Sequence, residues 1–129
     1  MLKPRVIPIL LIKNRDLVKS LQFDDHLYVG DPINTIRLFN EKKCDEILIY
    51  DISGQEHEID YNFIKIIASE SRMPVCYGGN VKKISEIEKI LSIGIEKISL
   101  NTVIFKDPDL VKTASVIFGK QSIVVTIDV

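Results

Sequence analysis

The sequence predicts an α/β fold in which parallel β-strands alternate with α-helices. Short runs rich in β-branched residues recur along the chain, and each is followed by a segment whose apolar residues have helical spacing. After the second strand, new strands begin at residues 46, 74, 97 and 122, a repeat of roughly 25 residues. Strand–helix units of one size in this order are typical of parallel strands joined by right-handed crossovers.

The elements are expected in the order β-α-β-α-β-α-β-α-β. Strands are predicted at 5–12, 46–52, 74–78, 97–101 and 122–129, and helices at 32–43, 60–71, 84–94 and 107–119. Pro32 and Pro108 fit the first turn of a helix, and Asp60 and Asp107 fit N-cap positions. Gly94 is expected to end the third helix, because glycine readily adopts the left-handed backbone of a helix terminus.

This repeat fits either a (βα)8 barrel or a doubly wound sheet. The barrel is favoured because the helices have similar lengths and because polar residues follow the strands, at what would be one face. A complete barrel needs roughly 200–250 residues. Residues 1–129 are therefore expected to form the N-terminal half of a single barrel domain, (βα)4 plus strand five. Its open sheet edges would need a C-terminal half-barrel or self-association to cover them.

The connection from residue 13 to residue 31 is too long for an ordinary loop between a strand and a helix. Long connections at the carboxyl ends of barrel strands are often active-site lids. A surface insertion with a small hairpin is the alternative. We favour the lid.

Composition excludes several classes of partner. The formal net charge is −1 and no basic run stands alone, so no nucleic-acid partner is expected. No apolar stretch reaches ~18 residues, which predicts a cytoplasmic protein without a membrane span. Cys44 and Cys76 are expected to be reduced, buried thiols, with a disulfide as the alternative. His26 and His57 lie in separate loops without partners at ligand spacing, so neither a metal site nor a cofactor is predicted.

Gly78 and Gly79 end the third predicted strand in "PVCYGGNVKK". Glycine packs poorly in a strand, so the pair indicates a place where the backbone itself is needed. Backbone N–H groups there, with the N-terminus of the next helix, could hold a phosphate. Asn101 and Thr102 end the neighbouring strand and could donate to the same anion. A tight turn without a ligand is the alternative, and phosphate binding is preferred.

Charged residues mark both ends of the predicted strands. Asp51 and Asp128 each end an apolar strand, where an acid is typical of a catalytic or substrate-binding role. A loop cap is the alternative for each. Arg5, Glu46 and Lys97 open three strands at the opposite face, and from the residues alone they predict a structural ion network.

Several segments together resemble a known family. "MLKPRVIP", "GDPINTIRLFNEKKCDEILIYDI", "YGGNV", "GIEKISLNT" and "VVTIDV" resemble the cyclase subunit of imidazole glycerol phosphate synthase. That family has a (βα)8 barrel and belongs with the phosphoribosyl isomerases of the histidine pathway. The resemblance spans the whole chain but covers only the N-terminal half of the family's length.

The resemblance implies a lyase that works with a glutaminase subunit. Ammonia from glutamine would cleave a phosphoribulosyl aminoimidazole carboxamide compound and close an imidazole ring. It implies that Gly79, Asn101 and Thr102 bind phosphate, that Lys19 belongs to a mobile first loop, that Asp51 lies near substrate and that Asp128 is catalytic. It also implies that Arg5, Glu46 and Lys97 form a gate where ammonia enters the barrel.

Two positions depart from the family's pattern. Leu11 stands in place of the family's first catalytic aspartate, and leucine can neither give nor take a proton. Asn80 replaces the third glycine of the phosphate loop and can still adopt a left-handed backbone. Leu11 resembles a branch associated with acetamidino modification of surface sugars. The preferred function is therefore an ammonia-dependent barrel subunit acting on a phosphorylated or nucleotide-linked sugar.

Two alternatives stay open. One is an ordinary histidine-pathway cyclase that produces imidazole glycerol phosphate. The other is a non-catalytic half-barrel that binds phosphate or a partner barrel.

Overall fold

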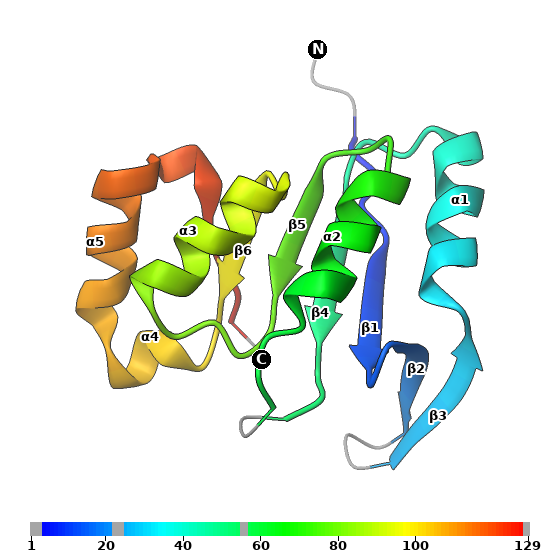
Figure 1. The fold of residues 1–129 in the computed structure, drawn as a ribbon, viewed down its shortest axis with the longest axis horizontal. Helices are drawn as coiled ribbons and strands as arrows, with labels where there is room; N and C mark the ends of the chain where they lie inside the picture. The colour runs from blue at the N-terminus through cyan, green and yellow to red at the C-terminus, as the bar shows by residue number, and fades with distance from the viewer. Residues whose placement is uncertain (1–3, 22–24, 55–56, 128–129) are drawn as a thin grey trace.

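The computed structural model describes residues 4–21, 25–54 and 57–127, and these form one mostly parallel sheet covered by helices (Figure 1). The strands are β1 (Ile9–Lys13), β2 (Asp16–Leu21), β3 (Asp25–Gly30), β4 (Ile47–Asp51), β5 (Val75–Gly78), β6 (Lys97–Leu100) and β7 (Ile123–Val125). Their spatial order is β3-β2-β1-β4-β5-β6-β7. The α/β prediction is confirmed.

The helices follow the strands as the repeat predicts. They are α1 (Pro32–Lys42), α2 (Tyr61–Glu70), α3 (Ile84–Ile93), α4 (Val103–Lys106) and α5 (Pro108–Phe118), with a 3₁₀ turn at Lys120–Ser122. Asp60 accepts a hydrogen bond from the Phe63 N–H at the start of α2, as predicted for an N-cap. Gly94 ends α3 with φ of 121°, a conformation that favours glycine.

All the long helices pack on one side of the sheet (Figure 1). From β1 through β7 the parallel strands follow each other without a reversal of order, so each right-handed crossover places its helix on the same face. The core lies between this face and the helices, and Ile36, Ile49, Ile64, Ile87 and Ile98 are almost completely buried there. The other side of the sheet is here called the inner face.

The first strand begins later than predicted. The expected strand 5–12 is observed as Ile9–Lys13. Pro4 and Pro8 have no N–H to give to a neighbouring strand, which limits pairing before Ile9. The carbonyl of Pro8 still accepts the N–H of Leu48 at 2.9 Å, so the segment follows the course of β4 before regular pairing starts.

The long first connection folds as the antiparallel hairpin β2–β3 and extends the sheet beyond β1. β1 turns into β2 through Asn14 and Arg15, which have φ of 51° and 67°, the left-handed conformations that tight hairpin turns require. The hairpin alternative for residues 13–31 is thus the one observed in the described part of this segment. The lid role stays a prediction.

The C-terminal elements differ from expectation in three respects. The short helix α4 was not predicted and follows β6 directly. Asp107 lies at the N-cap position of α5, but its side chain makes no capping hydrogen bond, so that part of the prediction is wrong. The last strand is β7, Ile123–Val125, shorter than 122–129, and residues 128–129 lie outside the described part. Among the described residues no helix is long and apolar enough to span a membrane.

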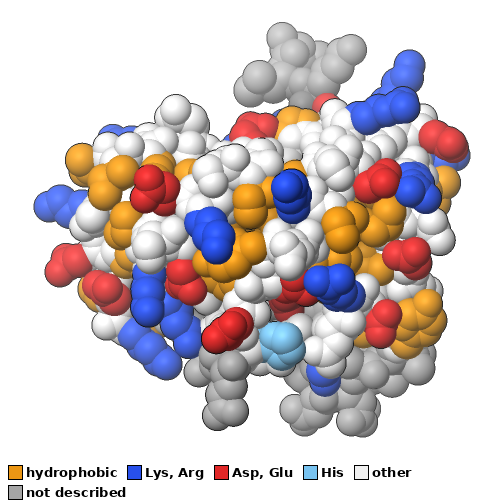
Figure 2. All heavy atoms as spheres, viewed as in Figure 1, with side chains coloured by type: hydrophobic (Ala, Val, Ile, Leu, Met, Phe, Trp, Pro, Cys, Tyr) orange, Lys and Arg blue, Asp and Glu red, His pale blue; other side chains and the backbone are white. Residues whose placement is uncertain are grey.

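The helix-covered surface carries charges of both signs. Acidic and basic side chains are interspersed over it, with apolar side chains between them (Figure 2). This mixture agrees with the formal net charge of −1. The side chains that Figure 2 colours on this face form no continuous basic stripe of the kind that nucleic-acid-binding proteins present.

Candidate functional site

A pocket of about 430 Å³ lies at the carboxyl ends of β4, β5 and β6. It brings together five residues expected to bind a ligand: Asp51, Gly79, Asn80, Asn101 and Thr102. Adjacent parallel strands end at the same edge of the sheet, so residues far apart in the sequence meet there.

The two glycines serve different purposes. A Cβ on Gly78 would lie 2.7 Å from Cε1 of Tyr50 and 3.0 Å from Cβ of Ser99. Gly78 therefore makes room for the tyrosine ring on the inner face. Gly79 has φ of 120°, and its Cβ would lie 2.2 Å from the carbonyl oxygen of Asp51. Gly79 thus allows the loop after β5 to run directly against the backbone at the end of β4.

The loop that follows Gly79 is fixed by its own hydrogen bonds. The Asn80 side-chain amide donates to the carbonyl oxygen of His57, and Asn80 has φ of 56°. The backbone N–H groups of Lys82 and Lys83 both donate to Oε1 of Glu86, at 2.9 and 3.0 Å. A carboxylate of α3 thus takes the two amides that precede the helix, and the role of the α3 N-terminus toward a phosphate stays a prediction.

One acceptor in this loop has no partner. Oδ1 of Asn80 is buried without a hydrogen-bond partner in the described structure. An unsatisfied buried acceptor is costly, so a donor from a ligand or water would be stabilised here.

Asp51 has a structural role in addition to its place in the pocket wall. Its Oδ1 accepts the N–H of Ser53 at 2.9 Å, as an aspartate does in a turn. Burial raises the pKa of the Tyr77 phenol, and the neighbouring Asp51 carboxylate raises it further. The loop-cap alternative is therefore observed for Asp51, while a role toward substrate stays a prediction.

Two lysines that sequence reasoning missed also line the pocket. Lys82 follows the Gly79–Asn80 turn, and Lys106 ends α4. Both are exposed, and among the lining residues that the structure describes Asp51 is the one acid. The balance of charge favours an anionic ligand. Lys106 could not be located from the sequence because α4 was not predicted.

Tyr50 and Ser99 line the pocket, and their hydroxyl groups meet that of Thr126. Tyr50 Oη lies 2.7 Å from Ser99 Oγ, and both also hydrogen-bond Oγ1 of Thr126. Ser99 is 2% exposed, although it is polar. These residues come from β4, β6 and the segment after β7, so the hydroxyls connect three parts of the inner face.

A charged cluster occupies the opposite end of the inner face. Glu46 is 4% exposed, and its carboxylate pairs with Arg5 at 3.0 Å and with Lys97 at 3.3 Å. The predicted ion network is confirmed, whereas the gate role stays a prediction. Cys76 lies near this cluster. Its burial, with Glu46 nearby, raises the pKa of its thiol to about 12.

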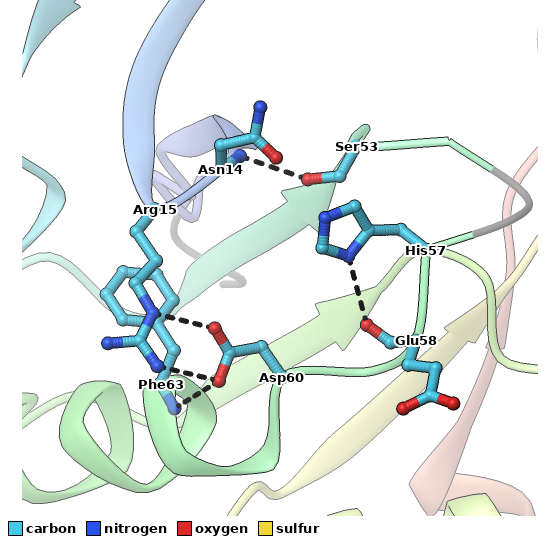
Figure 3. A network of polar contacts seen from close by, with 7 residues as sticks. All are labelled: Asn14, Arg15, Ser53, His57, Glu58, Asp60 and Phe63. Carbon is cyan, nitrogen blue, oxygen red and sulfur yellow. Dashed lines mark hydrogen bonds and ion pairs between the residues drawn. The ribbon is translucent and has the colours of Figure 1, made fainter.

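The base of the hairpin is joined to the loop between β4 and α2 (Figure 3). Arg15 forms two hydrogen bonds with Asp60, at 2.7 and 2.9 Å, and its guanidinium lies over the Phe63 ring. The Asn14 N–H donates to Ser53 Oγ at 3.1 Å. These contacts hold the turn between β1 and β2 beside α2.

Other predicted residues lie away from the pocket wall or outside the described part. Lys19 is on β2 and does not line the pocket. Leu11 is on β1, where it is the register partner of Tyr50, and is half-buried. Asp128 lies outside the described residues. His57 is exposed in the loop before α2, and the His26 side chain is not described. Cys44 and Cys76 are free thiols, of which Cys76 is buried and Cys44 only partly so.

Residues 5–129 match the family described as "Histidine biosynthesis protein". The chain belongs to this family. Its members are (βα)8 barrels, and the strand order and the pocket at the strand ends are those of about half of such a barrel.

Relatives in this family cover the whole chain. A protein of Vibrio vulnificus with the provisional name of an imidazole glycerol phosphate synthase subunit is 46% identical over 131 residues, 100% of this chain and 50% of the relative. One of Pseudomonas aeruginosa, also provisionally so named, is 47% identical over 130 residues, 99% of this chain and 52% of the relative. The imidazole glycerol phosphate synthase subunit HisF of Methanococcus maripaludis is 39% identical over 131 residues, 100% of this chain and 48% of the relative. The chain thus spans about half the length of the curated relatives it matches.

Proposed function

We propose that this chain is the N-terminal half of an imidazole glycerol phosphate synthase cyclase subunit. The complete barrel would take ammonia from a glutaminase partner and close the imidazole ring of a phosphorylated substrate. The observation that carries the proposal is the pocket at the ends of β4, β5 and β6, where Gly79, Asn101 and Thr102 meet. The family match and the names of the relatives support the same reaction class.

The rim of the pocket would hold the substrate's phosphate. Backbone amides near Gly79, the side chains of Asn101 and Thr102 and the two lysines provide donors and positive charge. Thr102→Val should weaken binding of inorganic phosphate to the complete protein, measured by titration calorimetry. Thr113→Val, an exposed position on α5, removes the same hydroxyl far from the pocket and should leave binding unchanged.

The reaction is tested with the complete protein, ammonia and the phosphoribulosyl aminoimidazole carboxamide intermediate. We expect formation of imidazole glycerol phosphate, at a rate limited by Leu11 in place of an acid. Leu11→Asp should raise the rate, since a positioned general acid or base contributes roughly 10²–10⁴-fold. The proposal fails if neither the natural protein nor the Leu11→Asp variant turns the intermediate over.

Leu11 also supports a second candidate function. An ammonia-dependent barrel that lacks this acid could instead convert the acetamido group of a phosphorylated or nucleotide-linked surface sugar to an amidine. Strong turnover of the histidine intermediate by the natural protein, with Leu11 in place, would contradict this second candidate.

A third candidate is a half-barrel that binds phosphate but catalyses nothing. It predicts phosphate binding without turnover of either substrate class. It is contradicted by turnover in the complete protein that is lost with Thr102→Val.

A further inference from the structure

Arg15 adopts a backbone conformation that arginine rarely takes. Its φ is 67°, in the left-handed region, and Asn14 before it has φ of 51°. Glycine enters this region without strain and asparagine tolerates it, whereas the Cβ of an arginine crowds the following carbonyl oxygen there. Residues in such conformations persist where surrounding contacts hold them, and they concentrate at functional sites. We therefore expect the Arg15 side chain to make contacts that offset this strain.

The Arg15 guanidinium makes these contacts with the start of α2 (Figure 3). It donates to both carboxylate oxygens of Asp60, at 2.7 and 2.9 Å, and lies 5.4 Å from the centre of the Phe63 ring. The same carboxylate accepts the N–H of Phe63 at 3.1 Å and so caps the helix. A two-pronged pair between arginine and a carboxylate fixes direction as well as distance. The turn between β1 and β2 and the start of α2 are thus held in one relative orientation.

The segment between β4 and α2 is attached to the same turn at its other end. The Asn14 N–H donates to Ser53 Oγ at 3.1 Å, while Asp60 at the end of the segment pairs with Arg15. Between these two attachments lies His57, which precedes Asp60 on the same segment (Figure 3). The place of the His57 backbone therefore depends on contacts that the turn makes.

His57 connects this segment to the pocket. Its carbonyl oxygen accepts a hydrogen bond from the side-chain amide of Asn80, which lines the pocket beside Gly79. A cavity of about 10 Å³ lies between the two segments, with Ile59 and Tyr77 among its lining residues. This space holds one water molecule at most. A shift of His57 would therefore be passed to Asn80, because there is little empty space to absorb it.

We propose that Arg15 is a positioning residue for the phosphate end of the pocket. Through its pair with Asp60 it holds the His57 carbonyl in place, and that carbonyl orients Asn80 beside the ligand. Arg15 is not among the described residues that line the pocket, so its effect on binding is indirect. Without the pair, part of the interaction energy of the ligand would go into ordering Asn80. The inference rests on the proposed phosphate site.

The experiment measures binding of inorganic phosphate to the complete protein by titration calorimetry. Arg15→Gln removes the pair with Asp60, and we expect the dissociation constant to rise about two- to tenfold, the effect of one net hydrogen bond. Arg37→Gln is the matched control, because Arg37 makes the same two-pronged pair with Glu70, at 3.1 and 3.0 Å, and is similarly exposed. This pair joins α1 to the end of α2, and neither residue lines the pocket. Arg37→Gln should leave the dissociation constant unchanged.

A second background tests whether the effect passes through Asn80. Asn80→Gly removes the side chain that contacts the His57 carbonyl, and glycine adopts the φ of 56° without strain. In this background Arg15→Gln should leave the dissociation constant unchanged. An arginine that only stabilised the fold, or acted by its charge alone, would weaken binding by the same factor in both backgrounds. That result would overturn the inference.

Asp60→Asn supplies a further test if Arg15→Gln proves unstable. Asparagine keeps an oxygen for the N-cap of α2 but removes the charge that pairs with Arg15. We expect the dissociation constant to rise by a similar factor. An unchanged dissociation constant in both variants overturns the inference and leaves the phosphate site standing. A natural protein that binds no phosphate overturns the phosphate site itself, and the inference with it.

Discussion

A substitution at Gly78 tests directly whether the Tyr50 ring packs over this glycine on the inner face of the sheet. In Gly78→Ala the new Cβ would lie 2.7 Å from Cε1 and 3.0 Å from Cδ1 of the tyrosine ring. Overpacking of this kind typically costs about 1–3 kcal/mol. The φ of Gly78 is not in the left-handed region, so alanine also brings a gain of about 0.4–1 kcal/mol from the unfolded chain. We expect the free energy of unfolding to fall by about 1–2 kcal/mol.

The same substitution should cost much less without the ring. In a Tyr50→Ala background the two nearest ring atoms are gone and Ser99 Cβ stays at 3.0 Å, so Gly78→Ala should cost at least about 1 kcal/mol less. Urea unfolding of the complete natural protein, the two single variants and the double variant measures the four free energies of this double-mutant cycle. Equal costs in both backgrounds would refute the assignment of Gly78 to the tyrosine ring.

Gly79→Ala is the matched control for this cycle. Its Cβ would collide with the backbone oxygen of Asp51 at 2.2 Å, and its φ of 120° is unfavourable for alanine. Neither cause involves Tyr50. The cost, about 3 kcal/mol, should therefore be the same in both backgrounds.

Three further predictions concern charge and thiols. The Arg15 guanidinium lowers the pKa of Asp60, so the ion pair stabilises the fold at pH values above the ordinary aspartate pKa of about 3.9, and this stabilisation is lost as pH falls through the pKa of the folded state. Arg15→Gln should therefore reduce the free energy of unfolding at pH 6, and the free energies of the variant and the natural protein should converge near pH 2. Iodoacetamide at pH 8 should label Cys44 before Cys76, because burial raises the pKa of the Cys76 thiol to about 12. Mass spectrometry of the digested protein identifies the labelled site, and equal labelling rates would contradict this prediction. Glu46→Ala should cost about 3 kcal/mol in urea unfolding, since it leaves two cations without their shared carboxylate; a loss below about 1 kcal/mol would contradict a structural role for the cluster.

The alternation of strands and helices was predictable because each unit is local. Asp60 caps α2 through a residue only three positions away, and Gly94 ends α3 by its own backbone conformation. The hairpin β2–β3 was less evident, since its register with β1 rests on two residue pairs and its turn contains no glycine. The helix α4 is four residues long, too short to show a helical period.

The candidate site was only partly predictable for a different reason. Gly79, Asn101 and Thr102 could be found because each lies within two residues of the end of a strand. The hydrogen bonds among the hydroxyls of Tyr50, Ser99 and Thr126 could not be predicted, since Tyr50 is 49 residues from Ser99 and 76 from Thr126 in the sequence. Ser99 stands in no short motif that would single it out in the sequence. The hydrogen bonds from Lys82 and Lys83 to Glu86 were not predicted, because the sequence does not show which acceptor the amides before α3 take.

The internal hydrogen bonds of the loop after β5 have a thermodynamic consequence. Glu86 and the Asn80 amide hold this loop with the chain's own groups. A ligand that arrives at Gly79 does not have to order the loop, so little of its interaction energy is spent on conformational entropy. Binding there should leave the conformation of the loop unchanged. We therefore expect amide-exchange protection in residues 79–83 to be similar before and after the ligand binds.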